Sequence, residues 1–210
     1  MNKQKSKKQI RIIEGALLIA LCITLCTGLW ARAQQQKLSG ELVRLHVIAA
    51  SDSDADQALK LRIRDRALMH LTPLLDRAQS VDDARAVIES ELPHLEKLAN
   101  DEIAAAGFDY SAAAALAPER YPTREYMGFA LPAGSYLSLR ITLGGGEGQN
   151  WWCVVFPPLC MTAVEERESI ATLSENSKKL IFAEEEEEYI LKFRLIEFFE
   201  SISPEHLDKR

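Results

Sequence analysis

The sequence has few of the residues that form metal and nucleophile sites. Its 210 residues include only four cysteines and four histidines. No two histidines stand in an H-x-x-x-H pattern and no two cysteines in a C-x-x-C pattern, so neither common spacing for zinc ligands is present. Cys22 and Cys26 fall inside an apolar N-terminal run, which leaves Cys153 and Cys160 for the rest of the chain. The sequence therefore predicts no metal site and no cofactor.

One acidic stretch resembles a calcium loop but lacks two of its required residues. Asp52, Asp54 and Asp56 have the spacing of the first three ligands of an EF-hand loop. Gln57 stands at the position that needs glycine, and Ile63 at the position that needs glutamate. We expect these aspartates to cap the start of a helix instead of binding calcium.

Positive charge is scarce beyond the N-terminus. The whole chain has a net charge of −6, and its first 33 residues carry six Lys or Arg and one Glu, so residues 34–210 carry −11. A domain this acidic is a poor nucleic-acid binder and is repelled by anionic lipid. We expect a protein partner or another basic surface, no nucleic acid, and membrane contact only through the N-terminal segment.

The chain has one long hydrophobic run, at residues 12–30, and it has the pattern of an export signal. Four lysines and Arg11 precede the run, and Ala31-Arg32-Ala33 offers an A-x-A cleavage site after it. We expect a signal peptide over residues 1–33. The alternative is an uncleaved membrane anchor, because the run approaches the roughly 20 residues that span a bilayer. The basic start keeps the N-terminus inside, so the remainder is exported.

A polar tether and a strand are expected next. Residues 34–40 are rich in glutamine, and residues 42–49 are β-branched and apolar before a Ser/Asp cluster. Because side chains alternate along a strand, the strand has one apolar and one mixed face. These faces are Leu45, Val47 and Ala49 on one side and Arg44, His46 and Ile48 on the other.

Two helices follow the strand. Ser53 with Asp56, and Ser80 with Asp83, have the spacing of helix N-caps and their reciprocal acids. Apolar residues recur every three or four positions after each cap, and Gly107 is placed to end the second helix.

The rest of the chain changes to short apolar runs, which predict strands separated by glycine turns. The glycine-rich tract at 144–148 lacks the Gly-Lys-Ser/Thr of a phosphate-binding loop and is expected to be a hairpin turn. The expected strands are 108–116, 121–130, 135–143 and 151–156. A connector at 162–178 and a helix at 180–200 make up most of a C-terminal part, 162–210. The order predicts a single α+β domain over residues 41–161, with helices packed on an antiparallel or mixed sheet.

The most distinctive stretch is residues 150–160, Asn-Trp-Trp-Cys-Val-Val-Phe-Pro-Pro-Leu-Cys. In a strand, Trp151 and Trp152 point to opposite faces, so one can fill the core and the other can face a partner. Pro157-Pro158 fixes an extended exit after Phe156. We take these five residues as candidate partner-binding residues.

The two exported cysteines have three possible roles. An even number outside the cytoplasm favours a Cys153–Cys160 disulfide, and two buried thiols are the alternative. Cys153 could also be a nucleophile if the fold brought His46, His70 or His94 beside it. Its apolar surroundings argue against that role, because burial raises a thiol's pKa and makes it inert.

Two charged groups complete the candidates. Arg44 and His46, with Arg64 and Asp65 of the first helix, could form a partner-binding cluster or merely a solvated helix face with a surface ion pair. The five acids Glu184–Glu188 begin the last helix, where acids suit the helix dipole. Their further role is left open by the sequence.

Several of these motifs together make the chain resemble the stage II sporulation protein R family. The resemblance covers about residues 41–161, with Ala50 where asparagine is expected and Met161 where an aromatic residue is usual. Its residues are Arg44 to Ala49, Ser51 to Ser53, Asp56 to Lys60, Ile63 to Asp65, Tyr121 to Thr123, Pro132 to Tyr136, and Asn150 to Cys160.

The resemblance implies an intercellular signal and not an enzyme. Such proteins are exported from the forespore into the space between the two septal membranes. There they activate a membrane-embedded aspartic protease of the mother cell, which processes the precursor of an early sigma factor. The alternative left open is an exported hydrolase of the cell envelope that uses Cys153 or a carboxylate such as Asp52 or Asp54.

Overall fold

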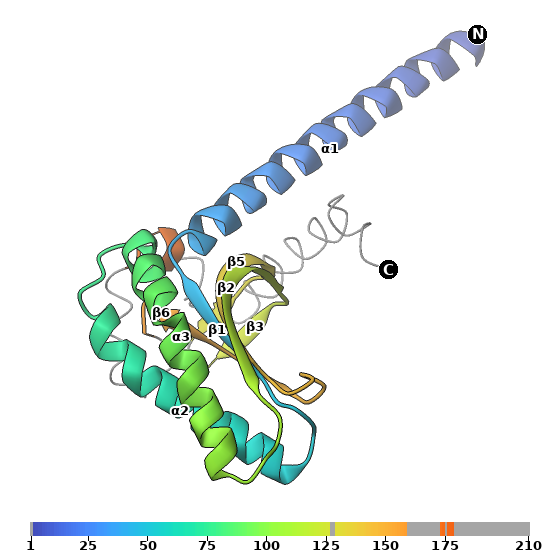
Figure 1. The fold of residues 1–210 in the computed structure, drawn as a ribbon. Coiled ribbons are helices and arrows are strands. Elements are labelled where there is room, and N and C mark those ends of the chain that lie inside the picture. Colours follow the sequence, from blue (N-terminus) through green and yellow to red (C-terminus); the bar gives the residue numbers. More distant parts are fainter. Residues whose placement is uncertain (1, 127–128, 159–172, 175, 179–210) are drawn as a thin grey trace.

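The structure is a computed structural model, and it describes residues 2–126, 129–158, 173, 174 and 176–178 (Figure 1). The expected helix at 180–200, the Glu184–Glu188 run, Cys160 and most of the expected connector lie outside the described residues. The helices are α1 (Asn2–Ser39), α2 (Asp54–Leu75) and α3 (Val81–Ala105). The strands are β1 (Val43–Ile48), β2 (Ala112–Tyr121), β3 (Arg124–Tyr126), β4 (Phe129–Leu131), β5 (Gly134–Leu143) and β6 (Asn150–Phe156).

The domain is built on a four-stranded mixed sheet of order β2-β5-β1-β6. β1 lies in the interior of the sheet, parallel to β5 and antiparallel to β6, and β2 pairs antiparallel with the outer edge of β5. Helices α2 and α3 pack together on one face of this sheet (Figure 1). The expected α+β class with a mixed sheet is confirmed.

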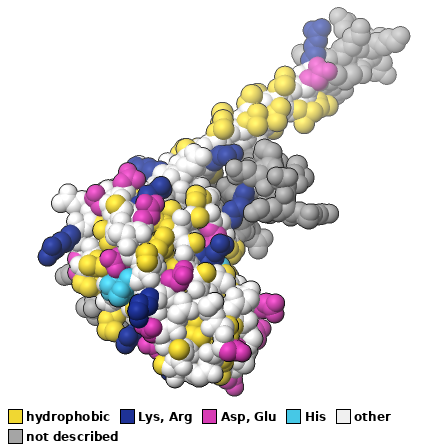
Figure 2. All heavy atoms as spheres, viewed as in Figure 1, with side chains coloured by type: hydrophobic (Ala, Val, Ile, Leu, Met, Phe, Trp, Pro, Cys, Tyr) yellow, Lys and Arg dark blue, Asp and Glu magenta, His cyan; other side chains and the backbone are white. Residues whose placement is uncertain are grey.

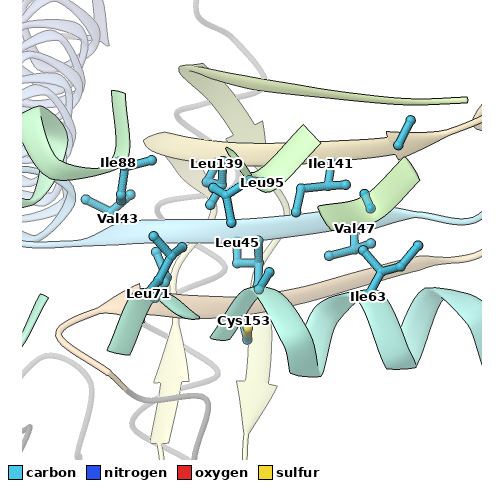
Figure 3. Close-up of a cluster of buried hydrophobic side chains, with 14 of the residues drawn as sticks. Val43, Leu45, Val47, Ile63, Leu71, Ile88, Leu95, Leu139, Ile141 and Cys153 are labelled. Carbon is cyan, nitrogen blue, oxygen red and sulfur yellow. The ribbon is translucent and has the colours of Figure 1, made fainter. Parts of the chain in front are cut away.

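The core lies between the helices and the sheet. Leu45 and Val47 of β1 point into it, as the alternation predicted, and both are fully buried (Figure 3). Every fourth position of α2 meets them, which is the spacing of one helix face. The α2 residues buried in this cluster are Leu59, Ile63, Ala67, Leu71 and Leu75.

Both helices begin as predicted. The Ser53 side chain accepts from Asp56 N, and the Ser80 side chain accepts from Asp83 N, which satisfies free N–H groups at the two helix starts. Gly107 follows α3 with φ +80°, a conformation that glycine adopts without strain.

One expected strand is instead three separate segments. Residues 121–130 were expected to be continuous, but β2 ends at Tyr121, and β3 and β4 form a two-stranded sheet of their own. Pro122 provides the physical reason, because proline has no N–H to continue the β2 ladder. The β3–β4 hairpin is therefore joined to the main sheet by side chains and not by a strand ladder.

Helix α1 projects from the domain and exposes hydrophobic side chains between Ile12 and Trp30 (Figure 2). Its segment Arg11–Ser39 is long and apolar enough to cross a membrane, as a signal sequence near the N-terminus also is. Residues 34–39 were expected to be a polar tether but are the last turns of this helix. Ala31, Gln35 and Leu38 fall on one helix face and are buried, so the glutamine-rich composition concealed a packed segment.

The loop between β1 and α2 is fastened to the turn between β5 and β6. Gln149 N donates to Asp52 Oδ1 (2.7 Å), and Lys60 Nζ donates to Gln149 O (3.0 Å). Gly148 N donates to Ala49 O (2.9 Å). Burial and nearby Arg64 lower the pKa of Lys60 below its usual value. Asp52 thus serves to tie the loop after β1 to the turn before β6, through its hydrogen bond from Gln149 N.

Asp56 is the second fixed acid of this loop. Its carboxylate accepts from the hydroxyls of Ser51, Tyr110 and Ser53. The hydrogen bonds from Ser51 and Tyr110 hold the pKa of Asp56 below its usual value, and burial opposes them. The expected role of Asp56 in starting the helix is confirmed. Tyr110, which lies between α3 and β2, is an additional hydrogen-bond partner.

Gly148 gives a stability test of this turn. A Cβ at Gly148 would lie 2.2 Å from Ser51 O, whereas a Cβ at Gly145 would meet only the Glu147 side chain at 3.5 Å. We predict that Gly148→Ala lowers the free energy of unfolding by about 2–4 kcal/mol, because backbone must move. The matched Gly145→Ala should change it by less than about 0.5 kcal/mol. Urea unfolding of both variants checks this, and equal effects would contradict the close approach at Gly148.

Candidate functional site

The face of the sheet opposite α2 and α3 is lined with cations, aromatic rings and hydrogen-bonding groups. Alternation along the strands brings them together, because Arg44 pairs with Ser138, and His46 pairs with Trp152, across adjacent strands. The β3–β4 hairpin adds further residues from the side. We call this set the opposite-face cluster: Arg44, His46, Glu119, Tyr121, Arg124, Tyr126, Tyr136, Ser138, Asn150 and Trp152.

Stacked side chains run along the opposite-face cluster. The Arg124 guanidinium carbon lies 3.9 Å from the Trp152 ring centre, and the His46 ring stacks on Trp152 with centroids 5.4 Å apart. His46 meets Tyr121 edge-on at 6.1 Å. Cations over aromatic faces are attracted by the ring quadrupole, by about 0.5–2 kcal/mol depending on burial. The stack therefore fixes the positions of the Arg124 guanidinium, the His46 imidazole and two aromatic rings.

Arg44 is the most constrained member. It is fully buried (0% exposed), and its guanidinium carbon lies 3.8 Å from the Tyr121 centroid and 5.0 Å from that of Tyr136. Nη2 donates to the Tyr126 hydroxyl (2.6 Å). Within the described part of the chain, neither Nε nor Nη1 has an acceptor. Arg44 is thus a buried cation held by rings and one phenol, and two of its nitrogens have no acceptor among the described residues.

His46 is held at both ring nitrogens. Nδ1 lies 2.9 Å from Glu119 Oε1, and Nε2 lies 2.8 Å from Asn150 Oδ1. Both partners are acceptors, and only the imidazolium form donates from both nitrogens. A neutral ring requires Asn150 to turn its amide so that the NH₂ group donates to Nε2.

Glu119 connects His46 to a buried chain of hydroxyls. Ser138 Oγ donates to Glu119 Oε2 (2.7 Å), and Tyr121 donates to Ser138 Oγ (2.7 Å). Burial raises the pKa of Glu119, but the hydrogen bonds from His46 and Ser138, and the nearby charges of His46 and Arg140, outweigh it and leave the pKa below its usual value. Burial raises the pKa of Tyr121 and of Tyr126, so both phenols stay protonated.

The arrangement suits binding better than nucleophilic chemistry. Ser138 is 1% exposed and its hydroxyl is committed to Glu119. Cys153 is disulfide-bonded, so it presents no thiol, and its expected partner Cys160 lies outside the described residues. Cys22 and Cys26 are free and exposed on α1.

The two tryptophans lie on opposite faces, as predicted, but neither enters the main core. Trp151 is 37% exposed, and Arg64 of α2 lies over its ring with the guanidinium carbon at 4.2 Å. Trp152 is half-buried and packs against the opposite-face cluster. The protein thus carries two arginine–tryptophan pairs, Arg64–Trp151 on the helical side and Arg124–Trp152 on the other.

The front cluster expected from the sequence is divided by the sheet. Arg44 and His46 lie on the opposite face, whereas Arg64 and Asp65 belong to α2 on the helical face. The two α2 side chains pair with each other, Arg64 Nη2 to Asp65 Oδ1 at 2.6 Å. Of the two alternatives, the structure therefore has the helix face with an ion pair between Arg64 and Asp65, because alternation along β1 turns Arg44 and His46 away from α2.

The residues after the tryptophans lie at a groove. Phe156 is buried in the main core, and Pro157 follows it. Phe156, Pro157 and residues 40, 41 and 78–81 line the groove, whose volume is about 540 Å³. Phe156 is therefore chiefly a packing residue.

Sequence reasoning did not single out Glu119, Arg124 and Tyr126 as site residues. Glu119 follows an alanine-rich run, and the other two lie on a strand of three residues. A usable signal was the alternation along β2, which puts Glu119 on the same face of the sheet as His46 once β1 and β2 flank β5. That placement depends on β1 and β5 being neighbours, which composition does not reveal.

The described part of the chain is an α+β domain on an apolar N-terminal helix, with cationic and aromatic side chains gathered on one face of its mixed sheet. The chain belongs to the stage II sporulation protein R family, whose family model matches residues 39–166. It is similar to stage II sporulation protein R of Bacillus subtilis (strain 168), with 34% identity over 182 residues that cover 77% of this chain and 81% of that protein. No solved structure gave a significant match. The resemblance inferred from the motifs is confirmed, and with it a role in sporulation.

Glu119 generates a pH prediction. Its pKa is lowered in the folded protein, so its contribution to stability is complete above the unfolded pKa of about 4.3 and is lost as pH falls through the lower folded pKa. We predict that Glu119→Gln lowers the free energy of unfolding by about 1–3 kcal/mol at pH 7, because one of two donors then faces an amide NH₂. The difference from the parent should shrink below about pH 4.

Urea unfolding at several pH values measures this difference. Glu125→Gln is the matched control, since Glu125 is an exposed acid of β3 and should leave the curve unchanged. A Glu119→Gln deficit that stays constant down to pH 3 would show that the charge of Glu119 is not what stabilises the cluster.

Proposed function

We propose that the protein is an exported signal of sporulation, sent from the forespore to the mother cell. In this proposal it reaches the space between the two septal membranes and activates a membrane-embedded aspartic protease. That protease then processes the precursor of an early mother-cell sigma factor. The protein itself acts by binding and performs no catalytic step.

The observation that carries the proposal is the extent of the family match. The matched residues 39–166 contain every residue of the opposite-face cluster and the loop that fastens Asp52 to Gln149. The family's name gives the role in sporulation, and the apolar segment Arg11–Ser39 supports export or anchoring.

Two of the three residues named for the hydrolase alternative, Cys153 and Asp52, have other roles in the structure. Cys153 is in a disulfide, and Asp52 accepts from the backbone of Gln149. No arrangement described above favours that alternative, so we do not propose it.

The proposal predicts cleavage of the sigma-factor precursor that depends on this protein. Non-sporulating cells would express the precursor and the candidate protease, with and without the full chain. We expect the processed form on an immunoblot only when all three are present. A variant without residues 1–33 should remain inside and leave the precursor intact, because activation requires export. No cleavage in the presence of exported, folded protein would sink the proposed function.

A further inference from the structure

The opposite face of the sheet has more buried donors than acceptors. Among the described residues, four buried side-chain atoms have no hydrogen-bond partner, and all four are N–H donors. They are Gln35 Nε2, Arg44 Nε, Arg44 Nη1 and Arg124 Nε. Gln35 packs on Gly134 at the end of β5, so all four belong to the face that α2 and α3 leave uncovered. A buried donor without an acceptor is costly, so this imbalance calls for a group that only accepts.

Arg44, Arg124 and Tyr126 are arranged to meet such a group together. Arg44 donates to the Tyr126 hydroxyl, and Arg124 lies two residues before Tyr126 on the same face of β3. The positive charges of both arginines lower the pKa of Tyr126 against the effect of burial, which reports their closeness to its hydroxyl. The Tyr126 hydroxyl already accepts from Arg44, so its own proton is available to a further acceptor.

We propose that Arg44, Arg124 and Tyr126 form a recognition site for a carboxylate side chain of a partner protein. A carboxylate has two oxygens and about four acceptor positions, and it bonds to guanidinium groups through two parallel N–H···O contacts. It therefore matches a site that consists of donors alone. The proposal rests on the proposed function only for the identity of the partner that presents the carboxylate.

Access to the site runs through the β3–β4 hairpin. Arg124, Tyr126 and Trp152 are half-buried, so they can be touched from solvent, whereas Arg44 lies behind them. The hairpin pairs only three residues with three and has no strand ladder to the main sheet. A two-stranded sheet of this size contributes little stability of its own. A carboxylate that takes the place of the Tyr126 hydroxyl would reach Arg44.

The surroundings favour a protein over a small ion as the source. Arginine and tryptophan are the residues most enriched at binding hot spots, and Arg124–Trp152 is such a pair on the surface beside the donors. Residues 34–210 carry a net charge of −11, so a polyacidic partner is repelled in general. A single acid on a complementary surface meets the two arginines without that penalty.

The site can be tested without any partner by titrating succinate into the full chain in neutral lipid nanodiscs. Replacing Trp30 and Trp151 by phenylalanine leaves Trp152 as the sole tryptophan, and its fluorescence reports on Arg124. We expect a saturable change with succinate and none with sodium chloride at equal ionic strength. Arg124→Gln should weaken binding at least fivefold, whereas the control Arg85→Gln, at an exposed arginine of α3 on the other side of the sheet, should leave it unchanged. A response that is shared with chloride, or indifferent to Arg124→Gln, overturns the proposal.

Arg44 has its own test, because a cation kept for a ligand should contribute little to folding. We expect Arg44→Met to abolish the succinate response while its Tm stays at or above that of the parent, since the apolar side chain needs no acceptor. A fall in Tm of more than about 5 °C would assign Arg44 a structural role and overturn its place in the site.

The source of the carboxylate is decided in the three-component cleavage assay. Arg124→Glu should reduce precursor cleavage at least tenfold, whereas the control Arg85→Glu, at an exposed arginine of α3 on the other side of the sheet, should retain it. Cleavage that survives Arg124→Glu, in a protein whose parent binds succinate, identifies a free dicarboxylate as the ligand and overturns the protein partner. Because the titration needs no protease, saturable succinate binding without any cleavage contradicts only the proposed function, and cleavage without succinate binding contradicts only this inference.

Discussion

The structure depends on β1 being buried on both of its faces. β1 lies between β5 and β6 in the sheet, and Val43 to Val47 are all buried. Its apolar face closes the core against α2 and α3, which is the ordinary outcome for an alternating strand. Its other face carries Arg44 and His46, and a strand in the interior of a sheet cannot turn them to solvent at its edge. The fold must therefore provide polar partners beneath its own sheet, and the opposite-face cluster consists of those partners.

The two polar residues of β1 differ in how completely the described residues satisfy their hydrogen-bonding groups. His46 has an oxygen at each nitrogen, and Glu119 passes the hydrogen bonding on to Ser138 and Tyr121. The hydrogen-bonding groups of these four residues find their partners within the chain, as a structural role requires. Arg44 has a phenol and two rings but, in the described residues, no carboxylate. A buried cation without a counter-charge is a poor way to stabilise a domain, so its presence is better explained by a partner.

The sequence predicts the local parts of this fold well and their assembly less well. The N-caps at Ser53 and Ser80, the two faces of β1 and the α+β class depend on short-range patterns, and the structure has them. The sequence left open whether Arg44 and His46 meet Arg64 and Asp65, and the alternation along β1, which turns Arg44 and His46 away from α2, decides against it. Residues 34–39 resembled a tether because glutamines conceal the spacing of Ala31, Gln35 and Leu38. Glu119 and Tyr126 were missed because their meeting with His46 and Arg44 depends on strand order, and strand order is a long-range property.

The end of α1 and the binding face are parts of one packed unit. Leu38 of α1 shares a buried cluster with Tyr121 and Tyr136, the rings that flank Arg44, and with Phe129 and Leu131 of β4. Eight residues separate Leu38 from exposed Trp30, which corresponds to roughly 12 Å of helix. As long as α1 lies in a membrane, the donors that lack a partner among the described residues are held within a short distance of the lipid surface. The β3–β4 hairpin, which covers Arg44, packs against the end of α1. Under the proposed function, a membrane-embedded partner would therefore need only a short exposed segment to present a carboxylate to Arg44.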